Sequence, residues 1–224
     1  TASFSKPKGN IVDTTKPRLI EAWDLPQAWF FAIKTIYESG VPFKVESGSE
    51  ITDTKKIAMV LSISHPENRP LLHEQAPCDL AYIENTYLDY LFEDTKTKEE
   101  SYTYGQRLRK PVDQIQKVIE GYKRVKGTRQ NTIVVRIPQD LDEPEPPCLT
   151  IIDTEIVDGR LVFYPYFRSW DCFAGLPANL AGLQYLKEYM AMEIGVAPGA
   201  TVAMSKNLHL YQRQFSHVEQ VIYR

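Results

Sequence analysis

The chain has 224 residues, of which 43% are hydrophobic and 25% are charged, and its formal net charge is −3. These proportions are typical of a folded globular protein with one sizeable core, and they exclude a disordered chain. The near balance of charge argues against a nucleic-acid binder, which is normally cationic, and no apolar run approaches the roughly 18 residues of a membrane span.

The N-terminal segment 1–17 is polar and carries lysines, so it does not resemble a signal peptide. We expect a flexible, poorly ordered arm there, followed by a single domain over residues 18–224. The three cysteines are odd in number and form no Cys-x-x-Cys pair, which argues against a disulfide framework and against a structural zinc site. A reducing, cytoplasmic setting fits this pattern.

Apolar spacing and chain-breaking residues predict the secondary structure in chain order. We expect a helix over 27–39, a strand over 56–62, helices over 79–92 and 110–126, a strand over 131–137, strands over 149–157 and 160–167, a helix over 177–194 and an extended segment over 201–211. Residues 139–147 are acidic and proline-rich and predict a loop. Because helices and strands mix without regular alternation, we predict one α+β domain with a large mixed or antiparallel sheet flanked by helices.

The pair Asp158-Gly159 separates two apolar runs and predicts a β-hairpin, since glycine tolerates positive φ. Counting residues from this turn places Phe167 opposite Thr150. Arg168 then falls beside Cys148, so strand pairing alone brings a guanidinium towards a thiol.

Cys148 follows the proline-rich loop and opens a strand. It is either a buried small hydrophobe or a nucleophile, and a nucleophile needs a pKa lowered by nearby cationic groups. Arg168 is either a member of a surface ion pair or a bidentate phosphate ligand. Asn179, at the expected start of a helix, is either a helix cap or an amide that reads a base edge. His209 and Tyr211 alternate along a strand and share a face, as a half-buried pair or as two hydroxyl-binding groups.

Several segments taken together resemble thymidylate synthase. They are Tyr104-Gly105-Gln106-Arg107, Pro147-Cys148, Arg168-Ser169-x-Asp171, Gly175-Leu176-Pro177-Ala178-Asn179 and His209-Leu210-Tyr211. Their order and spacing match the family from about Tyr102 to Tyr211, and the match is thin upstream. The Tyr-Thr-Tyr-Gly-x-Arg-Leu and Pro-Pro-Cys-Leu segments are similar to the archaeal branch of the family.

The resemblance implies reductive methylation of dUMP to dTMP through a covalent adduct between Cys148 and C6 of uracil. Tyr104 would help to remove the C5 proton, and Asp171 would contact uracil and the pterin side. The implied carrier is methylenetetrahydrofolate or, in the archaeal branch, methylenetetrahydromethanopterin, with no metal. The catalytic glutamate has no clean match; Glu84 is our choice, its alternative being a solvent-facing helix carboxylate.

For the substrate, the resemblance implies that Arg168 and Ser169 hold the phosphate and that Asn179 reads the uracil edge. His209 and Tyr211 would bond the deoxyribose 3′-hydroxyl. The family is homodimeric, and its partner subunit lends an Arg-Arg pair to the phosphate site. The matching pair here is Arg129-Gln130, so Arg129 would supply one charge from the partner; Lys126 is a further candidate.

The sequence also departs from the family. Leu149 stands where a histidine usually follows the cysteine, and the N-terminal Arg-Thr-Gly phosphate loop is absent, leaving Arg18 or Arg69 as substitutes. The chain ends soon after Tyr211, where the family continues into a tail that closes over the folate. We expect this difference to accompany a different one-carbon carrier.

Two alternatives follow from these departures. The first is a pyrimidine-nucleotide hydroxymethylase of the same superfamily, acting on dUMP, CMP or dCMP, in which water replaces the hydride. Asn179 argues against a deoxycytidylate substrate. The resemblance implies a tryptophan upstream of Tyr104 that helps to exclude water, but no tryptophan lies between Trp29 and Trp170. The second alternative is a non-catalytic nucleotide-binding protein on this scaffold.

Overall fold

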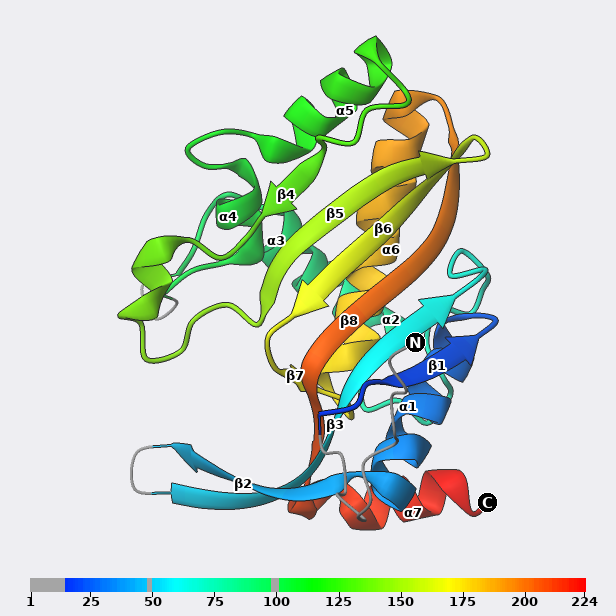
Figure 1. Cartoon of the computed structure of the whole chain (residues 1–224), viewed down its shortest axis with the longest axis vertical. Helices are drawn as coiled ribbons and strands as arrows, with labels where there is room; N and C mark the ends of the chain where they lie inside the picture. Colours follow the sequence, from blue (N-terminus) through cyan, green and yellow to red (C-terminus); the bar gives the residue numbers. More distant parts are fainter. Residues whose placement is uncertain (1–14, 48–49, 98–100) are drawn as a thin grey trace, which may run out of the picture.

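The computed structural model describes residues 15–47, 50–97 and 101–224. Most of the expected N-terminal arm, over residues 1–17, lies outside the described residues. The described strands form one mixed sheet, flanked by helices in a single α+β domain, as predicted (Figure 1). The strands are β1 (Arg18–Ala22), β2 (Val41–Ser47), β3 (Glu50–Ile63), β4 (Thr132–Val134), β5 (Leu149–Val157), β6 (Arg160–Phe167), β7 (Trp170–Asp171) and β8 (Ala197–Tyr211).

The lateral order of the sheet is β1-β3-β8-β6-β5-β4, with β2 paired to β3 and β7 paired to β8. The β1–β3, β6–β8 and β7–β8 pairs are parallel, and the remaining pairs are antiparallel. Strand β8, the last in the chain, therefore lies in the middle of the sheet.

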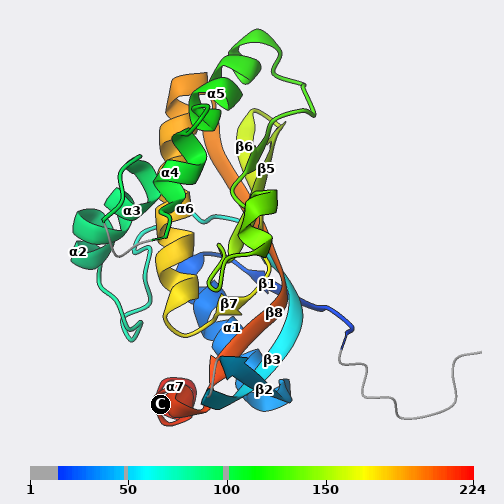
Figure 2. The same ribbon diagram turned by 90° about the vertical axis from the view of Figure 1, so that its left-hand side faces the viewer.

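The α-helices cover one face of this sheet, and among the described residues the opposite face carries no α-helix (Figure 2). In chain order, the helical segments are α1 (Leu25–Ser39), α2 (Leu80–Tyr82), the π-helical turn η1 (Ile83–Tyr87), α3 (Leu88–Phe92), α4 (Tyr104–Arg109), α5 (Gln114–Arg124), the 3₁₀ turn η2 (Pro138–Leu141), α6 (Gly175–Ile194), the 3₁₀ turn η3 (Gln212–Gln214) and α7 (Phe215–Ile222). Within the described ranges, no helix has the length and apolar character needed to cross a bilayer.

Most predicted elements are present, with corrections to their bounds and type. The strand predicted over 131–137 spans only Thr132–Val134, and the strand predicted over 56–62 begins at Glu50. The helix predicted over 110–126 begins only at Gln114, because Asp113 caps it by accepting a hydrogen bond from Gln116 N at 2.9 Å. The predicted helix over 79–92 contains the π-helical turn, and the helix predicted from 177 begins at Gly175. Strands β1 and β2, helix α4 and the η2 turn were not predicted, since their short segments carry little periodicity.

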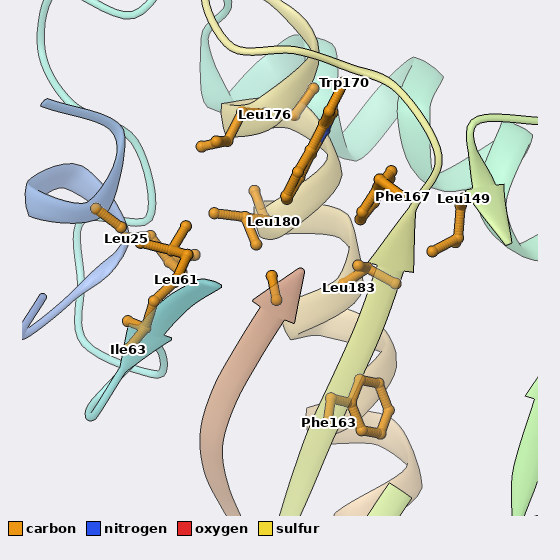
Figure 3. Packing of buried hydrophobic residues seen from close by; sticks show 14 of the residues in the cluster. Leu25, Leu61, Ile63, Leu149, Phe163, Phe167, Trp170, Leu176, Leu180 and Leu183 are labelled. Atoms are coloured by element: carbon orange, nitrogen blue, oxygen red, sulfur yellow. The ribbon is translucent and has the colours of Figure 1, made fainter. Parts of the chain in front are cut away.

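Helix α6 lies across the covered face of the sheet and supplies much of the core. Its Leu180 and Leu183 pack near Phe163 and Phe167 of strand β6 (Figure 3). A helix buried on nearly all sides has apolar residues around its whole circumference, and α6 fits this description. The packing of α6 therefore fixes the positions of those site residues that lie at its N-terminal end.

Lys187 is fully buried in the middle of α6. Its Nζ donates to the carbonyl oxygens of Gly199 and Ala200 at 2.7 and 3.1 Å and to Thr201 Oγ1 at 2.6 Å. These bonds tie α6 to the beginning of β8. Burial lowers the pKa of Lys187 to about 7, although two nearby glutamates oppose the shift.

We expect Lys187 to make the protein more stable as the pH rises from 7 towards 10.5, the ordinary pKa of a lysine. In this window the unfolded chain still binds the proton that the folded protein has released, so the free energy of unfolding increases, by at most about 1.4 kcal/mol per pH unit. Urea unfolding across this window should show a steeper rise for the wild type than for Lys187→Met. The exposed Lys123→Met is the matched control, and equal slopes for wild type and Lys187→Met would contradict the expectation.

Candidate active site

The candidate site lies where the sheet is interrupted. Strand β8 pairs with β6 as far as Phe167 and then with β7 from Trp170 onwards. Arg168 and Ser169 lie between these two pairings and leave the sheet. The backbone N of Arg168 donates to the carbonyl O of Cys148 at 2.9 Å, which confirms that the hairpin brings these residues together. A bulge between Leu149 and Ile151 shifts the register, so that Phe167 pairs with Leu149 and not with Thr150.

The Arg168 guanidinium holds the chain just before Cys148. Its Nε donates to Pro147 O at 3.0 Å and its Nη2 to Pro146 O at 2.5 Å. These contacts are to carbonyl oxygens, and no surface ion pair of Arg168 is found among the described residues.

Cys148 is half-buried and opens into a cavity of about 480 Å³ that Tyr102, Glu145 and Arg168 also line. Burial raises the pKa of the Cys148 thiol, Arg168 lowers it, and Glu145 raises it further. The predicted cationic neighbour is therefore present, but burial outweighs it. The thiolate at this position therefore needs a higher pH, or a further stabilising charge, than an exposed cysteine does.

Alkylation of Cys148 by iodoacetamide is expected to accelerate only at pH values above the ordinary range for a cysteine. Arg168→Gln removes the charge, so the pH at which the alkylation rate is half-maximal (the midpoint) should be still higher, because the guanidinium stabilises the thiolate. Mass spectrometry of the Cys148 peptide over time gives the midpoint for each protein. A midpoint that is unchanged or lower in the variant would show that Arg168 does not act on the thiol.

Tyr104 lies next to the thiol, in the first turn of helix α4. Its hydroxyl accepts a hydrogen bond from Leu149 N at 3.2 Å, and its side chain is 5% exposed. Burial raises the pKa of Tyr104 well above its ordinary value, so the phenol is protonated. Tyr104 therefore lies in a helix, with its hydroxyl bonded to the backbone next to Cys148.

The other residues of the Tyr-Gly-x-Arg segment have structural roles. A Cβ on Gly105 would lie 2.0 Å from the carbonyl O of Glu93, so only glycine allows α4 to pack against the end of α3. Arg107 Nη2 pairs with Asp140 Oδ1 at 2.5 Å, and this carboxylate is 1% exposed. This pair fixes the η2 turn that leads into the loop before Cys148.

Asn179 is not a helix cap, because α6 begins one turn earlier. Its Oδ1 accepts from Trp170 Nε1 at 2.7 Å, and its Nδ2 donates to the hydroxyl of Tyr87 at 2.6 Å. The turn before α6 is instead held by Asp171 Oδ1, which accepts from Phe173 N at 2.9 Å. The side chain of Asn179 lines a cavity of about 550 Å³ together with Tyr87.

His209 and Tyr211 lie side by side near the end of β8, with ring centroids 4.9 Å apart, as the strand periodicity predicted. His209 is 5% exposed, and burial lowers its pKa, so the imidazole is neutral at neutral pH. Its Nδ1 faces Asn207 O at 3.3 Å and carries the hydrogen. Its Nε2 is a buried acceptor that has no partner among the described residues.

Residues 20–224 match the family profile described as thymidylate synthase. The chain is 34% identical over 218 residues to a Methanococcoides burtonii protein, covering 94% of this chain and 97% of the relative. It is 32% identical over 212 residues to a Methanosarcina mazei protein, covering 92% and 94%. Both relatives carry the name "Putative thymidylate synthase".

The chain belongs to the thymidylate synthase family. The profile covers nearly all of the domain and extends well upstream of Tyr102, where the motifs alone were thin. Both relatives are archaeal, which agrees with the branch that the motifs resemble.

Not every residue that the resemblance to thymidylate synthase assigned to the site lies near Cys148. Glu84 is exposed on the outer side of η1, accepts from Tyr185 at 2.7 Å and borders a different cavity. Arg69 pairs with Glu188 through both terminal nitrogens, at 3.0 and 2.9 Å. The catalytic role of Glu84 stays a prediction, and Arg69 is already engaged.

The remaining predicted cations lie at two other places, one on the sheet and one in a link before it. Arg18 is exposed on the edge strand β1. Arg129 is exposed in the link between α5 and β4 and lines a cavity of about 660 Å³ with Arg124. Lys126 is exposed in the same link. None of these three lines the cavity of Cys148.

Some site residues were missed from the sequence. Tyr87, Tyr90 and Tyr102 are three of them. With the predicted Tyr104 they form a row of rings that connects the two cavities, in the order Tyr87, Tyr90, Tyr104 and Tyr102, with centroid distances of 6.1, 5.0 and 6.1 Å. Trp170 was read only as the variable position of Arg-Ser-x-Asp. Thirteen tyrosines in the chain are a compositional hint, but it assigns no position.

All three cysteines lie in the described part of the chain and are free thiols. Cys172 is fully buried, and burial raises its pKa well above the ordinary value. Among the described residues, no three His, Cys, Asp or Glu side chains come together in a way that could hold a metal ion.

Proposed function

We propose that this protein methylates dUMP to dTMP, with Cys148 as nucleophile and a methylene-tetrahydropterin as one-carbon donor. The observation that carries the proposal is the convergence of Cys148, Arg168 and the Tyr104 hydroxyl at the interruption of the sheet. His209 supports it, because its unpartnered Nε2 is an acceptor suited to a donating hydroxyl such as the 3′-hydroxyl of deoxyribose. Ser169, next to Arg168, would contribute its hydroxyl to the phosphate.

In the proposed reaction the Cys148 thiolate adds to C6 of uracil, and C5 becomes an enolate-like carbon that takes the one-carbon unit. Arg168 favours the thiolate electrostatically. Tyr104, kept protonated by burial, would help to move the C5 proton through water. Once the C5 proton has left, the bond between the methylene carbon and its carrier would break, and hydride from the carrier would reduce that carbon to a methyl group. The C6–S bond would break in the same step, which regenerates the Cys148 thiolate and completes one turnover. Asp171, which accepts from Phe173 N and Gln214 Nε2, orients the turn between the pyrimidine and pterin sides.

The pterin group supplies both the methylene carbon and the hydride when bound. The cavity beside Asn179 fits such a flat group, since Tyr82, Ala174 and Ala178 line it. Gly175, which adds no side chain, also lines it. The archaeal relatives and the similarity to the archaeal branch make the methanopterin carrier the first one to test.

A product assay with both carriers tests this function. Protein, dUMP and either methylenetetrahydrofolate or methylenetetrahydromethanopterin are incubated, and the nucleotide product is identified by mass spectrometry. A methyl group on C5 is expected with at least one carrier. A hydroxymethyl group would identify a hydroxymethylase, and nucleotide binding without tritium release from C5-labelled dUMP would identify a binding protein.

The helix-free face of the sheet supports the proposed homodimer. A row of register partners crosses it from edge to edge: Leu19, Val60, Met204, Tyr166, Ile151 and Val134. Side chains alternate between the faces of a strand, and neighbours of this row such as Leu61 and Ala203 are buried on the helix side. Leu19 is 64% exposed and Val134 44% exposed. An apolar row of this length is typical of a protein interface.

A second copy of the chain packed on this row would remove it from water, and Arg129 would then serve the partner's phosphate site.

Met204→Asp places a charge in the middle of the row and is expected to convert dimers into monomers. Light scattering after size exclusion measures the mass. Met192→Asp, which changes an exposed methionine at the end of α6, is the control. A monomeric wild type, or dimers that survive in Met204→Asp, would contradict the assignment.

A further inference from the structure

Both polar atoms of the Asn179 side chain are held from inside the protein. The indole Nε1 of Trp170 lies 2.7 Å from Asn179 Oδ1, and the hydroxyl of Tyr87 lies 2.6 Å from Nδ2. An indole N–H can only donate, so the atom that faces Trp170 must be the amide oxygen. The orientation of this amide is therefore fixed by chemistry, and a flipped amide would place N–H against N–H.

Tyr87 is placed by the π-helical turn η1, which ends at this residue. Its ring packs on helix α6 at Gly182, where an added Cβ would lie 2.4 Å from Tyr87 Cε1. Tyr87 is 7% exposed, and burial raises its pKa far above the ordinary value although the Asn179 bond lowers it. The phenol is therefore neutral and its hydroxyl accepts from Nδ2. A π-helical turn within a helix often marks a functional position.

Trp170 is placed by strand β7 and by stacking. Its ring lies parallel to that of Phe167, at a centroid distance of 3.8 Å and an angle of 6°, beside the first turns of α6 (Figure 3). With 2% of its surface exposed, Trp170 has no freedom to turn its Nε1 away from Asn179. The packing of a large aromatic residue thus determines the direction of one hydrogen bond.

The two internal bonds leave the amide with one N–H on Nδ2 and one lone pair on Oδ1 for a ligand. Gly175 has no side chain to cover this edge. Uracil presents an acceptor at O4 and a donor at N3, which complements this pair. Cytosine presents a donor at its 4-amino group and an acceptor at N3, so both contacts would be repulsive.

We propose that Trp170 and Tyr87 are positioning residues that hold the Asn179 amide in the orientation that accepts uracil and rejects cytosine. The inference rests on the proposed function, because it takes Asn179 as the group that reads the pyrimidine. The specificity of the site then depends on two residues behind Asn179 as well as on Asn179 itself. Without these two hydrogen bonds, the Asn179 amide would rotate and present the donor and acceptor pattern that complements cytosine.

The test uses Trp170→Phe and Tyr87→Phe. Each keeps an aromatic ring in place, the former on Phe167 and the latter on Gly182, and removes one polar group. We expect the dUMP to dCMP ratio, measured both as binding affinity and as kcat/KM, to fall at least about tenfold in each variant. Most of the change should come from improved dCMP binding, which a general loss of structure would not produce.

Tyr122→Phe is the matched control, since it removes a buried phenol hydroxyl that bonds Thr154 at 2.9 Å, away from the site. It should leave the ratio unchanged. A ratio within twofold of wild type in both site variants, with dUMP still converted by the wild type, would overturn this inference and leave the proposed function intact. A wild type that neither binds nor converts dUMP would overturn both.

Discussion

Replacement of Cys148 by serine is expected to reduce dTMP formation by at least about a thousandfold while dUMP still binds. Serine is nearly isosteric, so the cavity and the Arg168 contacts to Pro146 and Pro147 remain. Its hydroxyl is far less acidic than a thiol and a weaker nucleophile, so we expect addition to C6 to fail. The measurements are tritium release from C5-labelled dUMP and equilibrium dialysis with dUMP.

Cys172→Ala is the control for this experiment, because Cys172 is a fully buried thiol that takes no part in the proposed chemistry. It should retain activity. As a further check, each protein is incubated with 5-fluoro-dUMP and then denatured. The Cys148 peptide of the wild type should carry the mass of the nucleotide, and the corresponding peptide of the serine variant should not. Tritium release that persists in Cys148→Ser would rule out this cysteine as the nucleophile.

Asn179→Asp is expected to change the preference from dUMP towards dCMP by at least about a hundredfold. The carboxylate can still accept from Trp170 Nε1. The Tyr87 hydroxyl, which accepts from the amide, can turn and donate to the carboxylate, since a hydroxyl does both. The variant therefore folds, but it has lost the N–H that O4 of uracil needs and has gained an acceptor for the 4-amino group of cytosine.

Affinities for dUMP and dCMP, measured by calorimetry, give the size of this change. Asn85→Asp, which alters an exposed amide on the π-helical turn, is the matched control and should keep the dUMP preference. Equal preference in Asn179→Asp and wild type would mean that the side chain supports the structure and does not read the base.

The hairpin and the pair that it creates were predictable because they depend on local rules. Asp158 and Gly159 adopt φ angles of 49° and 73°, the positive values that the Asp-Gly pair favours. Once the turn was located, counting residues brought Arg168 to Cys148. The bulge before Ile151 was not predictable, and it shifts the pairing by one residue without separating the two.

The partners of Asn179 were not predictable, because they depend on packing between distant segments. Tyr87 lies 92 residues before Asn179 and reaches it only because η1 is π-helical and residue 182 is glycine. An apolar pattern gives the helical period of residues 79–92 but not a change of hydrogen-bond register within the helix. The burial that raises the pKa of Cys148 was equally hidden, since it comes from the tertiary structure around the loop.

The central place of β8 determines when the site can form during synthesis. Among the described strands, β1, β2 and β3 on one side and β4, β5 and β6 on the other are joined only through β8, which follows all of them in the sequence. Pairings between such distant segments make folding slow, since long loops must close first. Until β8 emerges, Cys148 and Arg168 can already be paired in their hairpin, while His209 and Tyr211 are still to come. The nascent chain can therefore pair its proposed nucleophile with Arg168 before it acquires the residues proposed to bind the sugar.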